Sequence, residues 1–99
     1  MTRLSAMDGR LTQMDYGEGV VLDYLTWEVD CARCGRHHSH GMAVSREPIH
    51  ELPRPGGGRI LVWQITGGRT VEDLTVAPSY WAESCGYHGW IRDGAWVPC

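Results

Sequence analysis

Two short motifs carry residues of the types that bind metal ions. Cys31-Ala-Arg-Cys34 and Cys85-Gly-Tyr-His88 each hold two ligand-type side chains with two residues between them, and 50 residues separate the motifs. Zinc is bound tetrahedrally by thiolates and imidazoles, commonly from two such knuckles. Gly35 and Gly86 each follow a cysteine and can adopt the positive φ of a tight turn. The sequence predicts one zinc site with the ligands Cys31, Cys34, Cys85 and His88.

Three more histidines follow the first knuckle, in the run Arg36-His37-His38-Ser39-His40. On a strand His38 and His40 share one face, so either could replace a cysteine in the site or begin a second metal site. The alternative is that they are exposed polar residues of a hairpin. Ordinary buried thiols or a redox pair remain the alternative for the CxxC motif. The pattern assigns no role to His37 or Cys99.

Length and charge narrow the class of protein. Ninety-nine residues predict one domain over residues 1–99, and a metal cross-link would help its small core. The formal net charge of −3 gives no electrostatic case for nucleic acid. No stretch is long enough for a membrane span and the first residues do not resemble a signal peptide, so we expect a cytoplasmic protein with reduced thiols.

The elements that must position these ligands are predicted to be strands. Residues 20–29 are rich in β-branched and aromatic types, and their partial alternation places Leu22 and Tyr24 on one face and Leu25 and Trp27 on the other. Residues 41–45 follow as a short return strand. Residues 1–17 are predicted to form a weak strand or an ordered N-terminal arm, and residues 46–58 are predicted to form a loop rich in proline and glycine.

Two hairpins complete the predicted fold. The first joins residues 59–66 to residues 70–76 through Gly67-Gly68, and the second spans residues 90–97 with Asp93-Gly94 at its turn. No amphipathic helix, phosphate-binding glycine loop or Ser/His/Asp ordering stands out. The fold class is therefore all-β or nearly so, a small zinc-ribbon-like antiparallel sheet built from hairpins.

About two thirds of the chain resembles a poorly characterised family of small bacterial and bacteriophage proteins of unknown function. The resemblance rests on the CxxC knuckle, the strand Trp63-Gln-Ile-Thr66, the segment Thr75-Val-Ala-Pro-Ser79 and the CxxH-x-x-Ile-x-x-Gly ending from Cys85 to Gly94. Some phage members carry an ammonia-monooxygenase-like label. The resemblance implies a phage or bacterial accessory protein, which would act in the host cytoplasm if a phage encodes it.

The segment Cys85-Gly-Tyr-His-Gly-Trp90 is also similar to the second ligand box of Rieske iron–sulfur proteins. Such a centre needs two cysteines and two histidines around a 2Fe-2S cluster. Its first box has the form CxH, whereas Arg33 and Arg36 stand two residues after Cys31 and Cys34. A Rieske centre would therefore need a rearranged first box that uses His37 or His38.

Three functions follow from these patterns. The first is a structural zinc module without catalytic residues, which acts through contacts with an unknown protein partner, because a closed four-ligand site leaves no position for water. The second is a Rieske-like electron-transfer protein. The third is a zinc-dependent hydrolase in which Glu83 serves as general base. We expect the first, which favours a protein that is not an enzyme without deciding the question. The acidic balance argues against nucleic acid as a partner.

Overall fold

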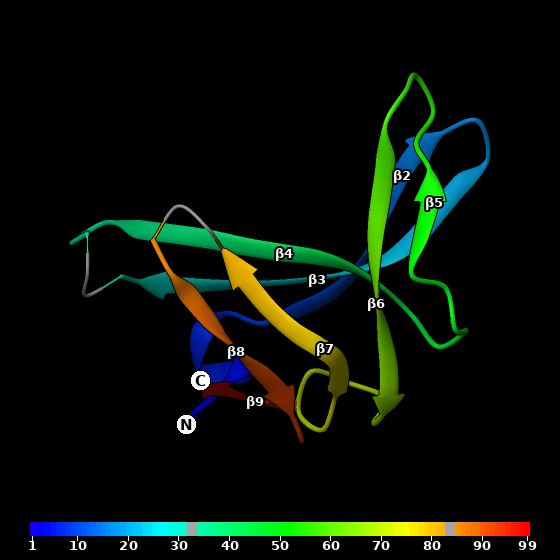
Figure 1. The fold of residues 1–99 in the computed structure, drawn as a ribbon. Helices are drawn as coiled ribbons and strands as arrows, with labels where there is room; N and C mark the ends of the chain where they lie inside the picture. Colours follow the sequence, from blue (N-terminus) through cyan, green and yellow to red (C-terminus); the bar gives the residue numbers. More distant parts are fainter. Residues whose placement is uncertain (32–33, 83–84) are drawn as a thin grey trace.

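The computed structural model describes residues 1–31, 34–82 and 85–99, and this part of the chain is almost entirely β-structure (Figure 1). Its one helical element is a four-residue 3-10 helix, η1 (Leu4–Met7). The strands in the described ranges are β1 (Thr2–Arg3), β2 (Arg10–Gly17), β3 (Val20–Asp30), β4 (His37–Ser45), β5 (Glu51–Pro53), β6 (Arg59–Gly67), β7 (Thr75–Ala82), β8 (Tyr87–Arg92) and β9 (Ala95–Pro98).

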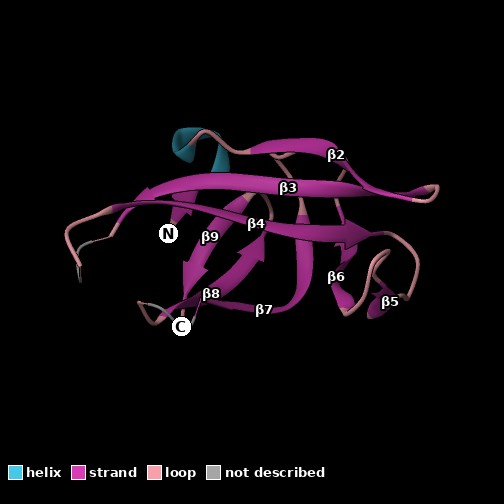
Figure 2. Cartoon of the chain, turned by 90° about the horizontal axis from the view of Figure 1, so that it is seen from above, coloured by secondary structure: helices cyan, strands magenta, loops and turns pink. Residues whose placement is uncertain are grey.

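The strands form one sheet in the order β1-β9-β8-β7-β6-β4-β3-β2, and β5 pairs with β6 outside this path. Neighbouring strands are antiparallel except β4 and β6, which run parallel from Ala43 to Ser45 and from Val62 to Gln64. Seen from above, β7, β8 and β9 lie on one side of the β3–β4 layer, so the sheet curls back on itself (Figure 2). The prediction of a nearly all-β, mostly antiparallel chain is confirmed.

Strand β3 shows how the alternation of side chains builds two cores. Leu25 and Trp27 are fully buried in the larger core, with residues from β4, β6, β7, β8 and β9. Leu22 and Tyr24 point to the other face and pack against a smaller core formed by Ala43, Ile60 and Val62. The two faces predicted for residues 20–29 are therefore confirmed, and each meets a different part of the curled sheet.

The C-terminal hairpin also follows the prediction. Strands β8 and β9 meet through Asp93 and Gly94, whose φ values of 48° and 74° fit a two-residue hairpin turn. A Cβ on Gly94 would lie 2.1 Å from the carbonyl oxygen of Glu72, so only glycine fits here.

The hairpin predicted around Gly67-Gly68 is wrong in its second strand. Strand β7 begins at Thr75, and Gln64 pairs with Ala77. The preceding residues form a longer turn because Oδ1 of Asp73 accepts hydrogen bonds from the backbone N–H groups of Arg69 and Thr70, both at 2.9 Å. A side-chain cap of this kind competes with strand pairing.

Two segments contain more regular structure than their composition suggests. Residues 1–17, predicted as a weak strand or an arm, include β1, η1 and β2, and Leu4 is fully buried. Residues 46–58, predicted as a loop, include β5, which pairs with the first residues of β6. In the described ranges no helix is long and apolar enough to cross a membrane.

Candidate functional site

The two knuckles have the backbone form that their glycines predict. Gly35 has φ of 68° and Gly86 has φ of 69°. The N–H of Gly35 donates to the carbonyl of Cys31 at 2.8 Å, and the N–H of Gly86 donates to the carbonyl of Ala82 at 3.1 Å. Both turns therefore close tightly, one between β3 and β4 and the other between β7 and β8.

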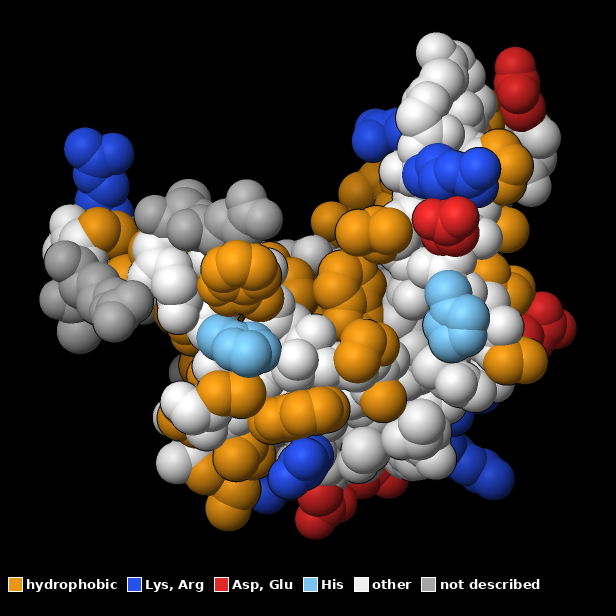
Figure 3. All heavy atoms as spheres, in the orientation of Figure 1, with side chains coloured by type: hydrophobic (Ala, Val, Ile, Leu, Met, Phe, Trp, Pro, Cys, Tyr) orange, Lys and Arg blue, Asp and Glu red, His pale blue; other side chains and the backbone are white. Residues whose placement is uncertain are grey.

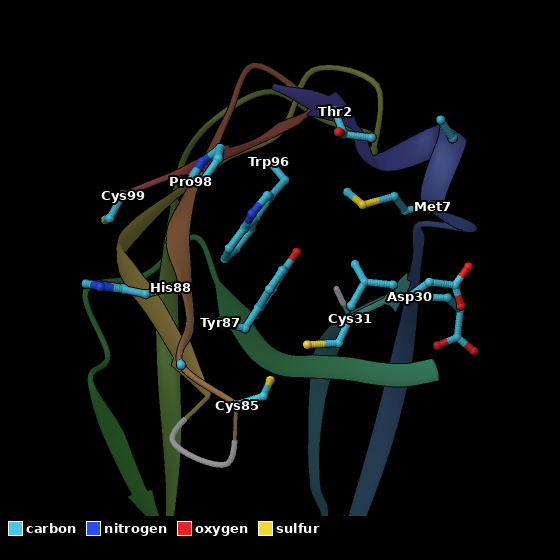
Figure 4. Close-up of a pocket in the computed structure, with 14 residues that line it drawn as sticks. Thr2, Met7, Asp30, Cys31, Cys85, Tyr87, His88, Trp96, Pro98 and Cys99 are labelled. Atoms are coloured by element: carbon cyan, nitrogen blue, oxygen red, sulfur yellow. The ribbon is translucent and has the colours of Figure 1, made fainter. Parts of the chain in front are cut away.

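The knuckles bring potential metal ligands together around His38. Ligand atoms of Cys31, His38 and Cys85 all lie within 4.8 Å of one another. Sγ of Cys34 lies 2.9 Å from Nε2 of His38, which joins the fourth side chain to this group. The close-up shows the sulfur atoms of Cys31 and Cys85 extending into the same space (Figure 4). Cys31, His38 and Cys85 could hold a metal ion.

His88, the fourth predicted ligand, lies on the other face of β8. The strand alternates so that Tyr87 packs against the larger core while His88 is exposed. Figure 4 shows the His88 ring directed away from Cys31 and Cys85. Its Nε2 atom instead lies 3.0 Å from Oγ of Ser79 on β7. The structure thus brings three predicted ligands together with His38 and places His88 beside a serine.

Ser79 is positioned by an irregularity in β7. Val76 pairs with Ile91, but Tyr80 pairs with Gly89, so three residues of β7 face a single residue of β8. The insertion contains the cis peptide bond between Ala77 and Pro78. Such bulges re-aim side chains next to functional sites, and this one brings Ser79 to His88.

Two tryptophans adjoin this serine and histidine pair. Nε1 of Trp63 donates a hydrogen bond of 3.3 Å to the carbonyl of Ser79. Trp81 pairs directly with His88 across the two strands, with a ring separation of 6.4 Å, and its side chain is 60% exposed. In the described ranges no carboxylate forms an ion pair with His88. Glu83, the predicted general base of a zinc hydrolase, lies outside the described residues.

His40 belongs to the aromatic core. It stacks on Tyr87 at 4.4 Å, and its Nδ1 lies 3.2 Å from the hydroxyl of Tyr80. Its side chain is almost completely buried, and Nε2 has no hydrogen-bond partner among the described residues. Burial lowers the pKa of His40, so the neutral ring is favoured. Its part in a second metal site stays a prediction.

His37 and Cys99 lie at the surface. Nδ1 of His37 is 2.8 Å from Asp30, and Nε2 is 3.7 Å from Glu28. The hydrogen bond to Asp30 is the main cause of the raised pKa of His37. Cys99 is exposed, and its N–H donates to the carbonyl of His88 at 3.1 Å. In the described ranges neither His37 nor Cys99 belongs to the group formed by Cys31, Cys34, His38 and Cys85.

A pocket of about 620 Å³ opens beside Cys31 and Cys85 (Figure 4). Tyr87 and Trp96 form one wall, with their rings stacked at 4.1 Å. The Tyr87 hydroxyl accepts a hydrogen bond of 3.1 Å from Nε1 of Trp27, and burial raises the pKa of Tyr87 to about 12. Aromatic packing thus holds the start of β8 rigidly behind the second knuckle.

Sequence reasoning did not pair Ser79 with His88. The two residues are separated by eight others, and both lie in segments on which the family resemblance rests. The recurrence of a Pro-Ser step ahead of the CxxH motif was the available signal. It could not show that the bulge turns Ser79 towards His88, because register is a property of the paired strands.

Comparisons with known proteins give one family. No curated protein and no solved structure matches the chain. The family that matches is bacterial, and neither a zinc-ribbon family nor a phage family is shown. Residues 11–99 match the family model described as bacterial ubiquitination-like system serine protease (BubE), and the chain therefore belongs to this family.

Proposed function

We propose that the protein is a serine protease in which Ser79 is the nucleophile and His88 is the general base. The observation that supports this most directly is the 3.0 Å contact between Oγ of Ser79 and Nε2 of His88. A hydroxyl needs an adjacent base within hydrogen-bond reach to become a nucleophile at neutral pH. Both side chains lie on the outer face of the β7–β8 pair, where a polypeptide can reach them.

The reaction needs only these two groups, a peptide bond and water. With the ring proton on Nδ1, Nε2 of His88 accepts the Ser79 hydroxyl proton while Oγ bonds to the carbonyl carbon of the substrate. The carbon–nitrogen bond then breaks, and the leaving amine takes the proton from His88. Water, activated by the same ring, hydrolyses the resulting ester and restores Ser79. The family description leads us to propose a protein of a bacterial ubiquitination-like system as substrate, in the cytoplasm.

We also propose that Cys31, Cys34, His38 and Cys85 bind one structural zinc ion. Zinc bonds of about 2.3 Å to sulfur and about 2.0 Å to nitrogen put tetrahedral ligand atoms roughly 3.5 Å apart, and the 4.8 Å limit of the described group accommodates this with a small contraction. Three thiolates and one imidazole are a known structural set, whereas a Rieske cluster needs two histidines on one iron. This arrangement leaves His88 available to Ser79.

Labelling with a fluorophosphonate tests the serine protease. We expect one modification per chain, at Ser79, which is lost in Ser79→Ala and strongly slowed in His88→Ala. Both variants should melt near the temperature of the unchanged protein, because neither side chain is in the core. Absence of labelling in a folded, metal-loaded preparation would contradict the proposal.

Metal content of two histidine variants tests the ligand set. We expect His38→Ala to lose most of the roughly one zinc per chain and His88→Ala to retain it. The same pair separates this arrangement from the set with His88 as ligand, which predicts the reverse. Two irons with acid-labile sulfide would instead support the iron–sulfur alternative.

A further inference from the structure

A groove of about 320 Å³ lies between β4, the N-terminal part of β6 and the β2–β3 pair, and Trp63 in its wall contacts the backbone of Ser79. It exists because β6 pairs with β7 only from Gln64 onward, whereas its earlier residues pair with β5 and β4, so that the later residues of β7 have no strand partner on that side in the described ranges. Figure 3 shows hydrophobic side chains along the concave surface between the β7–β8 pair and the projecting end of the molecule formed by β5 and the start of β6. The side chains used below are Tyr16, Tyr24, Trp63, Tyr80, Arg54 and Arg59.

The groove is connected to the proposed nucleophile through Trp63. Trp63 lines it and donates its indole N–H to the Ser79 carbonyl. Tyr80, also in the lining, follows Ser79 in the chain but packs its side chain against the larger core. Leu61 adds a 61% exposed aliphatic side chain to the wall. A polypeptide with its scissile bond at Ser79 can therefore continue along an apolar and aromatic surface.

The charged side chains that line the groove are two arginines, Arg54 and Arg59. Its described lining contains no carboxylate. Burial is the main cause of the raised pKa values of Tyr16 and Tyr80, which keeps both hydroxyls protonated. The Arg54 guanidinium lies 5.7 Å from the ring centre of Tyr16 and forms no ion pair with a described carboxylate. Arg59 is 3.1 Å from Glu51, so Arg54 is the less neutralised cation.

We infer that this groove binds the substrate on one side of the scissile bond and selects a peptide that carries a large apolar side chain near an acidic one. The apolar residue packs on Leu61 and Trp63, and the carboxylate pairs with Arg54. A guanidinium that forms no ion pair with a described carboxylate, such as that of Arg54, can recognise a carboxylate on a partner. This inference deepens the proposed function and rests on it for the position of the scissile bond.

The test measures binding without catalysis, on Ser79→Ala protein. The probes are fluorescein-labelled octapeptides of alanine and glycine that contain one leucine at a fixed position. In one series a glutamate is placed at each of the remaining positions in turn, and in the matched series a glutamine replaces that glutamate. We expect the best glutamate peptide to bind about three- to tenfold more tightly than its glutamine counterpart, and less so at high salt. Arg54→Gln should abolish this difference, whereas the matched surface variant Arg10→Gln should retain it, because Arg10 pairs with Asp8 outside the groove.

The aliphatic wall is tested in the same assay. Leu61→Ser should weaken the leucine peptides, and Val21→Ser, which alters another exposed aliphatic residue outside the groove, should not. Equal binding of glutamate and glutamine peptides, or equal effects of Arg54→Gln and Arg10→Gln, would overturn the inference. Fluorophosphonate labelling of Ser79 does not need the groove, so success there with failure here would leave the protease proposal in place.

Discussion

The two faces of the β7–β8 pair differ in burial and in the types of side chain that they carry. The inner face places Tyr80 and Tyr87 against the aromatic core. Cys85, which belongs to the group that could hold a metal ion, lies in the turn just before β8. The outer face presents Ser79 and His88, which touch each other at 3.0 Å. One strand pair thus contributes to the aromatic core on one side and carries the proposed catalytic residues on the other.

This difference explains how one CxxH motif can contribute one residue to the proposed metal site and another to the proposed active site. Cys85 lies in the turn before β8, where the backbone can direct its sulfur inward. His88 lies one residue after Tyr87 within the strand, so the pleat directs it outward. The CxxH spacing would direct Cys85 and His88 to one point if both lay in a turn. Because β8 begins at Tyr87, inside the motif, the two side chains are directed to opposite faces.

Removal of the metal should have the largest effect on the inner face. Treatment with a chelator should lower the melting temperature by about 10 °C or more, because the four proposed ligands would join the β3–β4 end of the sheet to the β7–β8 end. Circular dichroism before and after chelation, with recovery on added zinc, measures this. Identical melting of both samples would show that the inner face does not depend on a metal.

Replacement of a buried tryptophan and of an exposed tryptophan should affect different properties, the stability of the fold in one case and the labelling rate in the other. Trp27 is fully buried and donates to Tyr87, so Trp27→Ala should reduce the free energy of unfolding by about 3–5 kcal/mol. Trp81 is 60% exposed beside His88, so Trp81→Ala should change it by less than about 0.5 kcal/mol but slow labelling of Ser79. Urea unfolding and labelling rates measure the two effects. A large loss of stability in Trp81→Ala would remove the distinction between the faces.

Gly89 sharpens the comparison because it directly follows His88 on β8 and is buried. A Cβ there would lie 2.5 Å from the carbonyl oxygen of Val97 and 2.6 Å from the Trp96 ring. We expect Gly89→Ala to destabilise the fold by about 1–3 kcal/mol in urea unfolding. The control is Gly67→Ala, where the nearest atom is 3.9 Å away and φ is not positive. Equal effects of the two variants would argue against tight packing behind β8.

Asp73 lies away from both sites and should give the smallest effect. Hydrogen bonds from the backbone of Thr70 and Arg69 lower its pKa, so the carboxylate stabilises the fold above its usual pKa of 3.8, and this contribution is lost as pH falls through the lowered value. Asp73→Asn should lower the melting temperature slightly at pH 7. The difference should shrink towards pH 3, as thermal scans across this range would show. A constant difference would exclude the carboxylate charge as its cause.

Local patterns predicted much of the secondary structure. Alternation placed Leu25 and Trp27 on one face of β3, and the glycines after the cysteines marked both knuckle turns. These features depend on a few adjacent residues, so the sequence contains the information directly. The cap from Asp73 and the parallel pairing of β4 with β6 were not predicted, because each depends on a competition between alternative pairings.

The candidate site was predicted less well than the fold. The cysteines could be grouped from spacing alone, but the choice between His38 and His88 depends on where β4 and β8 begin. Ser79 was not recognised because a bulge sets its direction, and bulges change the register without a unique signal in the residues.

Only Gly86 and Tyr87 separate Cys85 from His88, so a metal that fixes the position of this segment would couple its own binding to peptide binding at the proposed active site. If the metal-loaded protein binds a peptide at Ser79 more tightly than the metal-free protein, the peptide must raise the metal affinity by the same factor. Substrate would then protect the zinc from a chelator, so that the supply of one ligand controls the retention of the other.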